Sequence, residues 1–503
     1  MTAEANNRER DRGRQRGRGD STNSTEGAET AGNRARAFAR LATRREAIAA
    51  FGICLVFLAA GAGPWREVAH DFFGRTHPFW VREDFTAFYA AGHVVGSGMA
   101  SHLYDTETIR AAEHLAAGRQ VGGSGLLMYF NPPFFALVYW PLTHLSLQQA
   151  YQLWTVFSIG LLALNSWLLL RLTPGLSRRW QVVLVLGYLT LYPVTFGLRL
   201  GQFSLLLQAS WAAGALLLEQ SRDRWAGLAF APLLIKPELL IPVSIFILAK
   251  RRWQTLATLV PIALAAVVGS IAMVGVPTAL QYPGFVLGST ASNGNGVAPN
   301  LMIDYSGAIA ATLGHGASIT RPLASTALAV ASLAAVALLA NERRGAGRSE
   351  SRLLASGSPD PGGVDRDFRI EWLAVSLAAV LSDPHLYLQD TVIVVPAALA
   401  LLPALHGAAR NQFALVLAFG WGIQRLALYP NDHLHVDLFA LLLTAMLFVL
   451  LAKGWHAPRW KRAERPERLG RRAEQPRLER SGERALEPVG IVELGDGAGG
   501  SGA

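Results

Sequence analysis

Long apolar runs separated by short polar turns dominate the chain between Ala47 and Leu451. The runs are about 17 to 25 residues long, the length of a helix that crosses a hydrocarbon core about 30 Å thick. They predict spans at about 47–63, 151–170, 181–198, 203–219, 255–276, 321–340, 371–382, 391–405, 411–428 and 434–452. With half-length helices included, the total is about eleven or twelve. We therefore expect an all-α polytopic membrane protein.

The apolar stretch from Trp225 to Ala249 has basic residues at both ends and the sequence "IKPEL" near its middle. A single crossing would place one basic cluster outside, against the positive-inside rule. We expect instead a hairpin of two half-helices, each about 15 Å long at 1.5 Å per residue. Lys236 and Glu238 would then lie near mid-membrane.

The distribution of Lys and Arg predicts the orientation of the chain. Basic residues cluster at 34–45, 171–179, 222–224, 250–252, 342–369 and 453–484, while residues 277–320 contain none. The clusters are therefore expected in the cytoplasm and the 277–320 loop outside. The resulting organisation has basic, disordered cytoplasmic tails at 1–46 and 453–503 around a membrane domain at 47–452, with a large outer loop at 64–145 and a cytoplasmic loop at 341–370.

Composition supports the membrane assignment and limits the function classes. Hydrophobic residues make up 51% of the chain and charged residues only 16%, well below the roughly 25% of a soluble protein. The net charge of +10 lies mostly in the tails and cytoplasmic loops, where anionic lipids explain it without nucleic acid. The one cysteine, Cys54, excludes a disulfide framework and a cysteine-based metal site.

Polar residues group at the outer face in this topology. Asp84, Arg199, Gln202 and the segments 382–390 and 429–437 lie outside, with Lys236 deeper beneath them. Ionisable groups at membrane depth are costly unless they are paired or face a wet cavity, so each is a candidate site residue. A carboxylate can accept a proton from a hydroxyl nucleophile, and cations can stabilise a departing phosphate. The pattern favours a glycosyltransferase that uses a lipid-phosphate donor, because the chain has no Gly-rich nucleotide-binding loop.

Several motifs, in order, resemble glycosyltransferase family 87. They are "DFTAFYAAGHVVGSGMASHLYD" (84–105), "MYFNPPFFALVYWPL" (128–142), "LGQFSLLL" (200–207), "AGLAFAPLLIKPELLIPV" (226–243) and "SDPHLYLQD" (382–390). The family is similar to bacterial polyprenol-phosphate-mannose-dependent mannosyltransferases and has the GT-C fold. Asn131 stands where the family more often has Tyr before its paired prolines, and Glu83 precedes Asp84 without an assigned role.

The resemblance implies a general base and a donor cavity lined by the "NPP", "GQ" and "KP" positions, and the other roles below are a hypothesis from residue type and predicted place. Asp84 would be the general base, at the start of a helix along the outer surface. Arg199, Gln202, Lys236 and His385 would bind the donor phosphate, and Tyr89, Asn131, Pro132, Glu238 and Asp383 would line the cavity. Attack opposite the phosphate would invert the anomeric carbon, so a β-linked donor would give an α-linked product. We expect no cofactor and no metal, a polyprenyl-phosphate-linked sugar donor, and a glycan or glycolipid acceptor at the outer face of a bacterial plasma membrane.

Other interpretations remain open. Three candidate residues have structural alternatives: Asp84 could be an N-cap, Arg199 an interfacial anchor and His385 a helix cap. His433, His435 and Asp437 form a possible metal cluster, although an i, i+2 histidine pair does not share one helix face. The chain as a whole could instead be a transporter or lipid flippase, or an inactive partner in an envelope-assembly complex. The Gly- and Asn-rich segment "STASNGNGVAPN" predicts a mobile outer segment, which we interpret as a lid over the site.

Overall fold

The protein is helical throughout the part that the computed structural model describes, residues 44–74, 84–118, 126–292, 302–313, 320–353, 365–424 and 438–455. Within these ranges the only β-type pairing is a single bridge between Met302 and Tyr387. The all-α prediction is confirmed. The two tails lie almost wholly outside the described residues, so their assignment stays a prediction.

Seventeen labelled α-helices follow the first helix, Arg44–Phe72. Their bounds are α2 Asp84–Gly96, α3 Thr106–Ala117, α4 Pro133–Tyr139, α5 Leu147–Leu172, α6 Arg178–Leu189, α7 Tyr192–Leu200, α8 Ser204–Glu219, α9 Asp223–Ala229, α10 Leu240–Lys250, α11 Trp253–Val274, α12 Val276–Ser292, α13 Tyr305–Leu313, α14 Thr320–Leu353, α15 Arg366–Ser382, α16 Val394–Leu401, α17 Gly407–Ile423 and α18 Leu438–Trp455. Short 3-10 helices include η4 Trp140–His144, η5 Ala231–Ile235, η6 Pro237–Leu239 and η8 Leu388–Ile393.

Among the residues that the structure describes, four helices are long and apolar enough to cross a membrane. They are Arg44–Phe72, Leu147–Leu172, Trp253–Val274 and Thr320–Asn341, and α6 with α7 would make a fifth. Shorter apolar helices occur at Ser204–Glu219, Leu388–Ala404 and Phe439–Ala452. The protein is therefore a multi-pass membrane protein, while the expected total of eleven or twelve helices stays a prediction.

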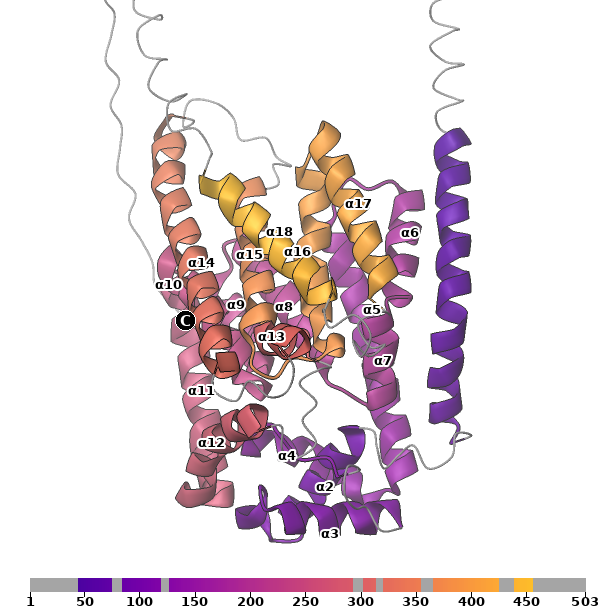
Figure 1. Ribbon diagram of the computed structural model, residues 1–503, viewed down its shortest axis with the longest axis vertical. Helices are drawn as coiled ribbons and strands as arrows, with labels where there is room; N and C mark the ends of the chain where they lie inside the picture. Colours follow the sequence, from indigo (N-terminus) through magenta and orange to yellow (C-terminus); the bar gives the residue numbers. More distant parts are fainter. Residues whose placement is uncertain are drawn as a thin grey trace, which may run out of the picture. The chain divides into compact units, whose positions relative to one another are not determined.

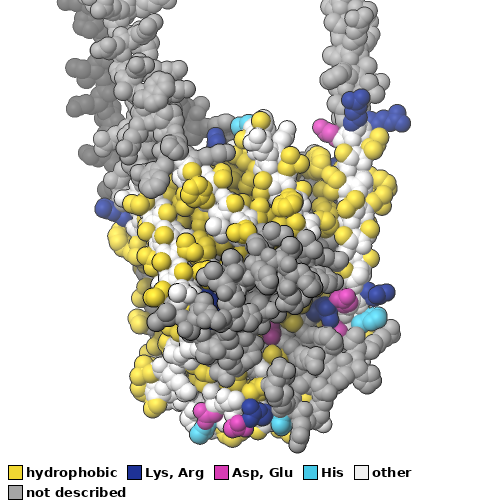
Figure 2. Space-filling model, viewed as in Figure 1, with side chains coloured by type: hydrophobic (Ala, Val, Ile, Leu, Met, Phe, Trp, Pro, Cys, Tyr) yellow, Lys and Arg dark blue, Asp and Glu magenta, His cyan; other side chains and the backbone are white. Residues whose placement is uncertain are grey.

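The surface of the long helices is apolar, as a lipid-facing surface requires. Figure 2 shows hydrophobic side chains along their flank, with charged and histidine side chains gathered toward the two ends. The apolar side chains that point outward come from helices far apart in sequence and include Leu55, Phe157, Val268, Val330 and Phe448. A side surface of this kind explains how a chain rich in exposed Leu, Val and Phe remains stable in a bilayer.

Two spans differ from the sequence prediction. The first helix continues to Phe72 instead of ending near residue 63. The expected span 181–198 is broken between α6 and α7, whose axes differ by 44°. Pro193 occupies the first turn of α7, where its missing N–H costs no hydrogen bond.

The stretch from α9 to α10 folds back on itself, as the sequence predicts. The helix is interrupted by η5 and η6, and Lys236 between them has a non-helical backbone (φ −131°, ψ 77°). The residue before a proline avoids the α conformation, and Pro237 follows Lys236. Asp223 at the start of α9 forms an ion pair of 2.9 Å with Arg252, which lies just after α10. The chain therefore returns to the side from which it entered, with Lys236 at the turn.

Helices α2, α3 and α4 lie across one end of the bundle of long helices (Figure 1). The buried face of α2 includes Phe85, Phe88, Tyr89, Ala91 and Gly92. A Cβ added at Gly92 would lie 2.7 Å from the backbone carbonyl carbon of Tyr139, so only glycine allows this approach of α2 to α4. The Tyr89 hydroxyl donates to the carbonyl of Leu145 at 2.8 Å and ties the same helix to η4. The opening helix of the predicted outer loop is therefore rigidly docked.

The expected outer loop 277–320 is partly helical. Helices α12 and α13 occupy much of it, and the bridge from Met302 to Tyr387 joins it to the segment after α15. Most of the predicted lid, residues 293–300, lies outside the described residues. After this loop, α14 continues to Leu353, beyond residue 340, where the sequence predicts the end of the span.

Candidate functional site

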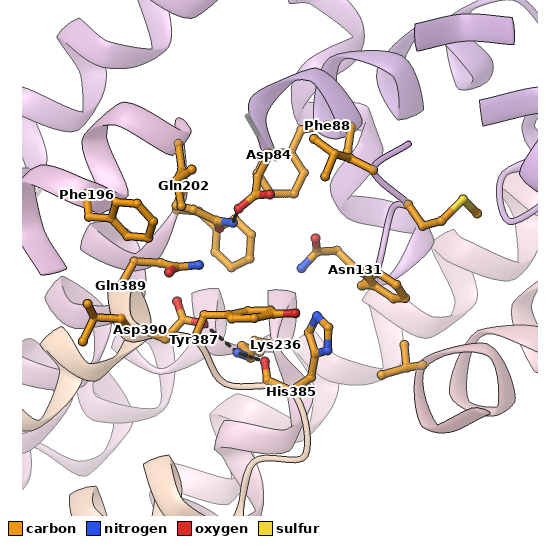
Figure 3. A pocket seen from close by; sticks show the side chains of 18 of the residues that line it. Asp84, Phe88, Asn131, Phe196, Gln202, Lys236, His385, Tyr387, Gln389 and Asp390 are labelled. Carbon is orange, nitrogen blue, oxygen red and sulfur yellow. Dashed lines mark hydrogen bonds and ion pairs between the residues drawn. The ribbon is translucent and has the colours of Figure 1, made fainter. Parts of the chain in front are cut away.

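A cavity of about 260 Å³ opens between α2 and the turn that follows α15. Its polar lining residues are Asp84, Asn131, Gln202, Lys236, Glu238, His385, Tyr387, Gln389 and Asp390. Figure 3 shows Asp84 on one wall, with Lys236, His385 and Tyr387 on the opposite wall. Phe88, Phe130, Phe196 and other apolar side chains fill the remaining surface. Mostly apolar walls with a few convergent polar groups are typical of a small-molecule site.

Asp84 is the first residue of α2, and its carboxylate is held by Gln202. The Gln202 side-chain amide donates to Asp84 Oδ2 (Figure 3). Gly201 makes this contact possible: its φ is +67°, and an added Cβ would lie 2.6 Å from the Cβ of Phe85. Glycine adopts this left-handed conformation without steric cost. The sequence "GQ" thus places a hydrogen-bond donor directly against the predicted base.

Burial makes Asp84 a stronger base than a free aspartate. It raises the pKa of the Asp84 carboxyl to about 6; the hydrogen bond from Gln202 lowers this pKa and the nearby negative charge of Asp390 raises it. A carboxylate that is ionised at neutral pH, yet has a pKa close to the operating pH, is well suited to accept a proton during a reaction.

Lys236 lies in a cluster of acceptors at the floor of the cavity. Its Nζ donates to Asp390 Oδ2 at 2.7 Å and to the His385 carbonyl at 2.9 Å, and it lies 3.1 Å from Asp383 Oδ2. Ser204 donates to the other oxygen of Asp390 at 2.5 Å. The ammonium group is therefore neutralised by two carboxylates, and its predicted contact with the donor phosphate stays a prediction.

In the turn 383–387, the backbone N–H and carbonyl groups of the central residues, His385 and Leu386, are all hydrogen-bonded. The His385 N–H donates to Asp383 Oδ1 at 2.8 Å, and the Leu386 N–H donates to Asp304 Oδ2 at 3.1 Å. The Leu386 carbonyl accepts from the Ile303 N–H at 2.8 Å. Lys236 binds the remaining carbonyl, that of His385, as described above. Asp383 within the turn and two other segments, residues 303–304 and Lys236, thus fix the turn that carries His385 and Tyr387 into the cavity.

His385 is a neutral imidazole in this setting. Burial and the nearby charge of Lys236 lower the pKa of His385 to about 3. Its ring packs against Phe130, with a centroid distance of 4.8 Å, and against Tyr387 at 5.1 Å. Its ring lines the cavity, and its predicted contact with the donor phosphate stays a prediction.

Arg199 is placed away from the cavity. Its Nε donates to Asp71 at 2.8 Å and its Nη1 to Glu67 at 2.7 Å, so it joins α7 to the first helix. It is not among the residues that line the cavity. The structure thus shows Arg199 joining two helices outside the cavity lining, and its predicted contact with the donor phosphate stays a prediction.

The predicted lining residues divide into two groups. Asn131 and Glu238 line the cavity, and Asn131 is fixed by a 3.2 Å hydrogen bond from its Nδ2 to the Ile235 carbonyl. Tyr89, Pro132 and Asp383 do not line it. Tyr89 packs α2 against η4, Pro132 precedes α4, and Asp383 lies behind the floor against Lys236.

Besides Tyr387, three further residues that were not predicted contribute to the site. Asp390 and Gln389 line the cavity from η8, and the buried Asp304 holds the turn 383–387. Asp390 ends the motif "SDPHLYLQD", and its nearness to Lys236 could be suspected because a buried lysine requires a counter-charge. No sequence pattern marks Asp304, whose partners follow it by up to 82 residues.

The described residues contain no group of three or more His, Cys, Asp or Glu side chains that could hold a metal ion. His433, His435 and Asp437 lie outside the described residues. The chemistry that the cavity itself offers is a positioned carboxylate base, several neutral amides, and one lysine bound to carboxylates.

A comparison with protein-family models matches residues 129–357 to Glycosyltransferase family 87. No curated protein and no solved structure matches the chain. The matched segment contains Asn131, Gln202 and Lys236. Asp84 and the 383–390 segment lie outside it, on either side, yet they form walls of the same cavity.

Proposed function

Because the chain belongs to glycosyltransferase family 87 and is a multi-pass membrane protein, we propose that it transfers a sugar, mannose, from a polyprenyl-phosphate donor to a hydroxyl of an envelope glycan or glycolipid. The observation that carries this proposal is the Asp84 carboxylate: it lines the cavity, accepts a hydrogen bond from Gln202 and has a pKa raised to about 6. Asp84 is the general base of the proposed reaction.

The reaction follows from this one base. Asp84 takes the proton of the acceptor hydroxyl while the hydroxyl oxygen attacks C1 of the donor sugar. The bond between C1 and the phosphate oxygen breaks, and its electron pair leaves with polyprenyl phosphate. Because attack and departure occur on opposite faces, a β-linked donor gives an α-linked product. The proton on Asp84 is released to solvent before the next turnover.

The cationic ligands expected for the leaving phosphate are reduced to one. Arg199 lies elsewhere and His385 is neutral, so Lys236 is the remaining predicted cation at the cavity. Its bonds to Asp383 and Asp390 give it a second task, which is to hold the floor of the site. The amide of Asn131 is an additional donor for the departing group, and the amide of Gln389 can bind sugar hydroxyls.

A lipid-linked donor suits this chain better than a nucleotide sugar. The described residues form only helices and short connections, without the strand, Gly-rich loop and helix that cradle a nucleotide phosphate. The exposed apolar flank of the long helices provides a bilayer location in which a polyprenyl chain is soluble. The site is proposed to face the outside of a bacterial plasma membrane, with both termini in the cytoplasm.

Transfer by purified protein in nanodiscs tests the donor class. Radiolabelled mannose is supplied either as polyprenyl-phosphate-β-mannose or as a nucleoside-diphosphate mannose, together with extracted envelope glycolipids. We expect label in a glycolipid product from the lipid-linked donor alone, and an α linkage by NMR. Transfer from the nucleotide sugar, or a β-linked product, would contradict the proposal. Movement of the lipid donor across the bilayer without any transfer would favour a flippase.

A further inference from the structure

Two residues that line the cavity carry a buried polar side-chain atom without a hydrogen-bond partner among the described residues. These atoms are Nδ1 of His385 and Oε1 of Gln389. Buried polar groups are nearly always paired, and an unpaired one in a binding cavity indicates a place that a ligand fills. Gln389 is the more informative of the two, because a carboxamide both donates and accepts hydrogen bonds.

Gln389 is held firmly by its neighbours. It lies in the first turn of η8 and is 2% exposed. The next residue, Asp390, is fixed by Lys236 and by Ser204, and its own N–H donates to the Tyr387 carbonyl at 3.0 Å. In the view of Figure 3 the Gln389 carboxamide lies between Gln202 and Asp390. A side chain on such a rigid element is preorganised for recognition.

The chemistry of Oε1 limits what it can bind. An amide oxygen is an acceptor, so its partner must bring a hydrogen. An ionised phosphate oxygen is itself an acceptor and would be repelled. A sugar hydroxyl can donate to Oε1, and a neighbouring hydroxyl can accept from Nε2. We propose that Gln389 is a specificity-determining residue that binds a hydroxyl of a sugar in the cavity; this rests on the proposed function for the identity of the substrate.

The sugar that Gln389 binds belongs either to the donor or to the acceptor, and binding measurements distinguish them. They use protein that also carries Asp84→Asn, so that bound donor is not consumed. One arm measures the Kd of polyprenyl-phosphate mannose and of its 2-, 3-, 4- and 6-deoxy analogues. The other arm measures the Kd of methyl α-mannoside and of the corresponding deoxy compounds. Binding needs no transfer, so failure of the proposed reaction does not affect this test.

We expect one analogue in one arm to bind about tenfold or more weakly than its parent, and Gln389→Met to abolish that difference. A site built to bind a hydroxyl discriminates strongly against a ligand without it. In this double-mutant cycle, removal of the hydroxyl and of the carboxamide should cost no more together than either alone. An unchanged preference among the analogues in Gln389→Met, in both arms, would overturn the proposal.

Thermal unfolding separates recognition from a structural role. Since Oε1 has no partner in the described protein, Gln389→Met should leave the Tm of the ligand-free protein unchanged or raise it. Gln208 is the matched control: it is fully buried and also has an unpaired atom, but its Oε1 accepts from the Tyr188 hydroxyl at 2.7 Å and it does not line the cavity. Gln208→Met should lower Tm and keep the preference among analogues. A larger loss of Tm in Gln389→Met than in Gln208→Met would overturn the proposal by assigning Gln389 a structural role.

Discussion

At the scale of single residues, the site is defined by the way hydrogen bonds assign each charge to a partner. Asp84 is paired with a neutral amide and keeps its basic character, whereas Lys236 is paired with carboxylates and loses much of its positive field. The two charged groups thus differ in how far their charge is available to a ligand. These assignments could not be read from the chain, because Asp84 and Gln202 are 118 residues apart and Lys236 and Asp390 are 154 apart.

The pH dependence of transfer should report the pKa of Asp84. Only the ionised carboxylate accepts a proton, so kcat/KM should fall as pH drops through about 6. The hydrogen bond from Gln202 lowers this pKa. Gln202→Leu should therefore move the acidic limb to higher pH, with the greatest loss of activity at low pH. Profiles of kcat/KM between pH 5 and 9 check this, and an identical limb in both proteins would show that Asp84 is not the group that titrates.

Replacement of Lys236 should mainly affect stability. Lys236→Met leaves Asp383 and Asp390 buried beside each other without a counter-charge, and loss of one partner from a buried pair typically costs about 3–5 kcal/mol. A second change, Asp390→Asn, should restore part of the loss. Thermal unfolding of the detergent-solubilised variants measures both effects. Wild-type stability of Lys236→Met together with loss of donor binding would instead identify Lys236 as a direct phosphate ligand.

At the scale of elements, the site depends on close approach between helices that are distant in sequence. The α7–α8 connection touches α2 through Gly201, and the Lys236 turn touches η8. The long spans could be predicted from the length of the apolar runs. The break at "IKPEL" could be predicted from its proline and from the basic residues at both ends of the stretch. The break at Thr190 was missed because α6 and α7 together have the length and polarity of one span. Helix α12 was missed because it contains two prolines and two glycines, and α13 was missed because it has only 9 residues.

Gly201→Ala tests the contact between α7 and α2. The alanine methyl would combine a positive φ with a clash against Phe85. Overpacking of this kind costs about 1–3 kcal/mol, and the displaced Gln202 should reduce transfer at least tenfold. Gly175→Ala is the matched control, because Gly175 has φ +84° but no atom within 4 Å of the added Cβ. In the control, the unfolding assay should show only the destabilisation caused by the positive φ, and the transfer assay should show activity close to wild type. Equal activity of the two variants would contradict a specific role for the close approach.

At the scale of the whole molecule, the apolar flank and the charged ends define a multi-pass protein, which the sequence alone predicts well. Amino-acid composition and run length suffice for that conclusion because the bilayer imposes one dominant constraint on spanning segments. The candidate site was predicted in part. Asp84, Asn131, Gln202, Lys236, Glu238 and His385 do meet at one cavity, but Arg199 does not. The sequence shows which polar residues would be costly to bury in a membrane protein. Only the three-dimensional arrangement shows which hydrogen bonds and ion pairs stabilise them.

The membrane orientation can be tested with introduced cysteines. In a Cys54→Ala background, Glu107→Cys in α3 should react with a membrane-impermeant maleimide in intact cells. Arg224→Cys and Gln254→Cys lie on either side of the α9–α10 hairpin, whose ends are joined by the Asp223–Arg252 ion pair. Both should react only after the membrane is permeabilised. Labelling of Arg224→Cys and Gln254→Cys from opposite sides would show that this stretch crosses the membrane.

The most direct test of the central claim compares wild type with Asp84→Asn in nanodiscs, using radiolabelled polyprenyl-phosphate mannose and envelope glycolipid. The asparagine keeps the size and a hydrogen-bond acceptor for Gln202 but cannot accept the proton. General-base catalysis contributes about 10²–10⁴-fold. We therefore expect the variant to bind donor with wild-type Kd and to transfer sugar at least a hundredfold more slowly. Transfer by Asp84→Asn at the wild-type rate would contradict the assignment of Asp84 as the base.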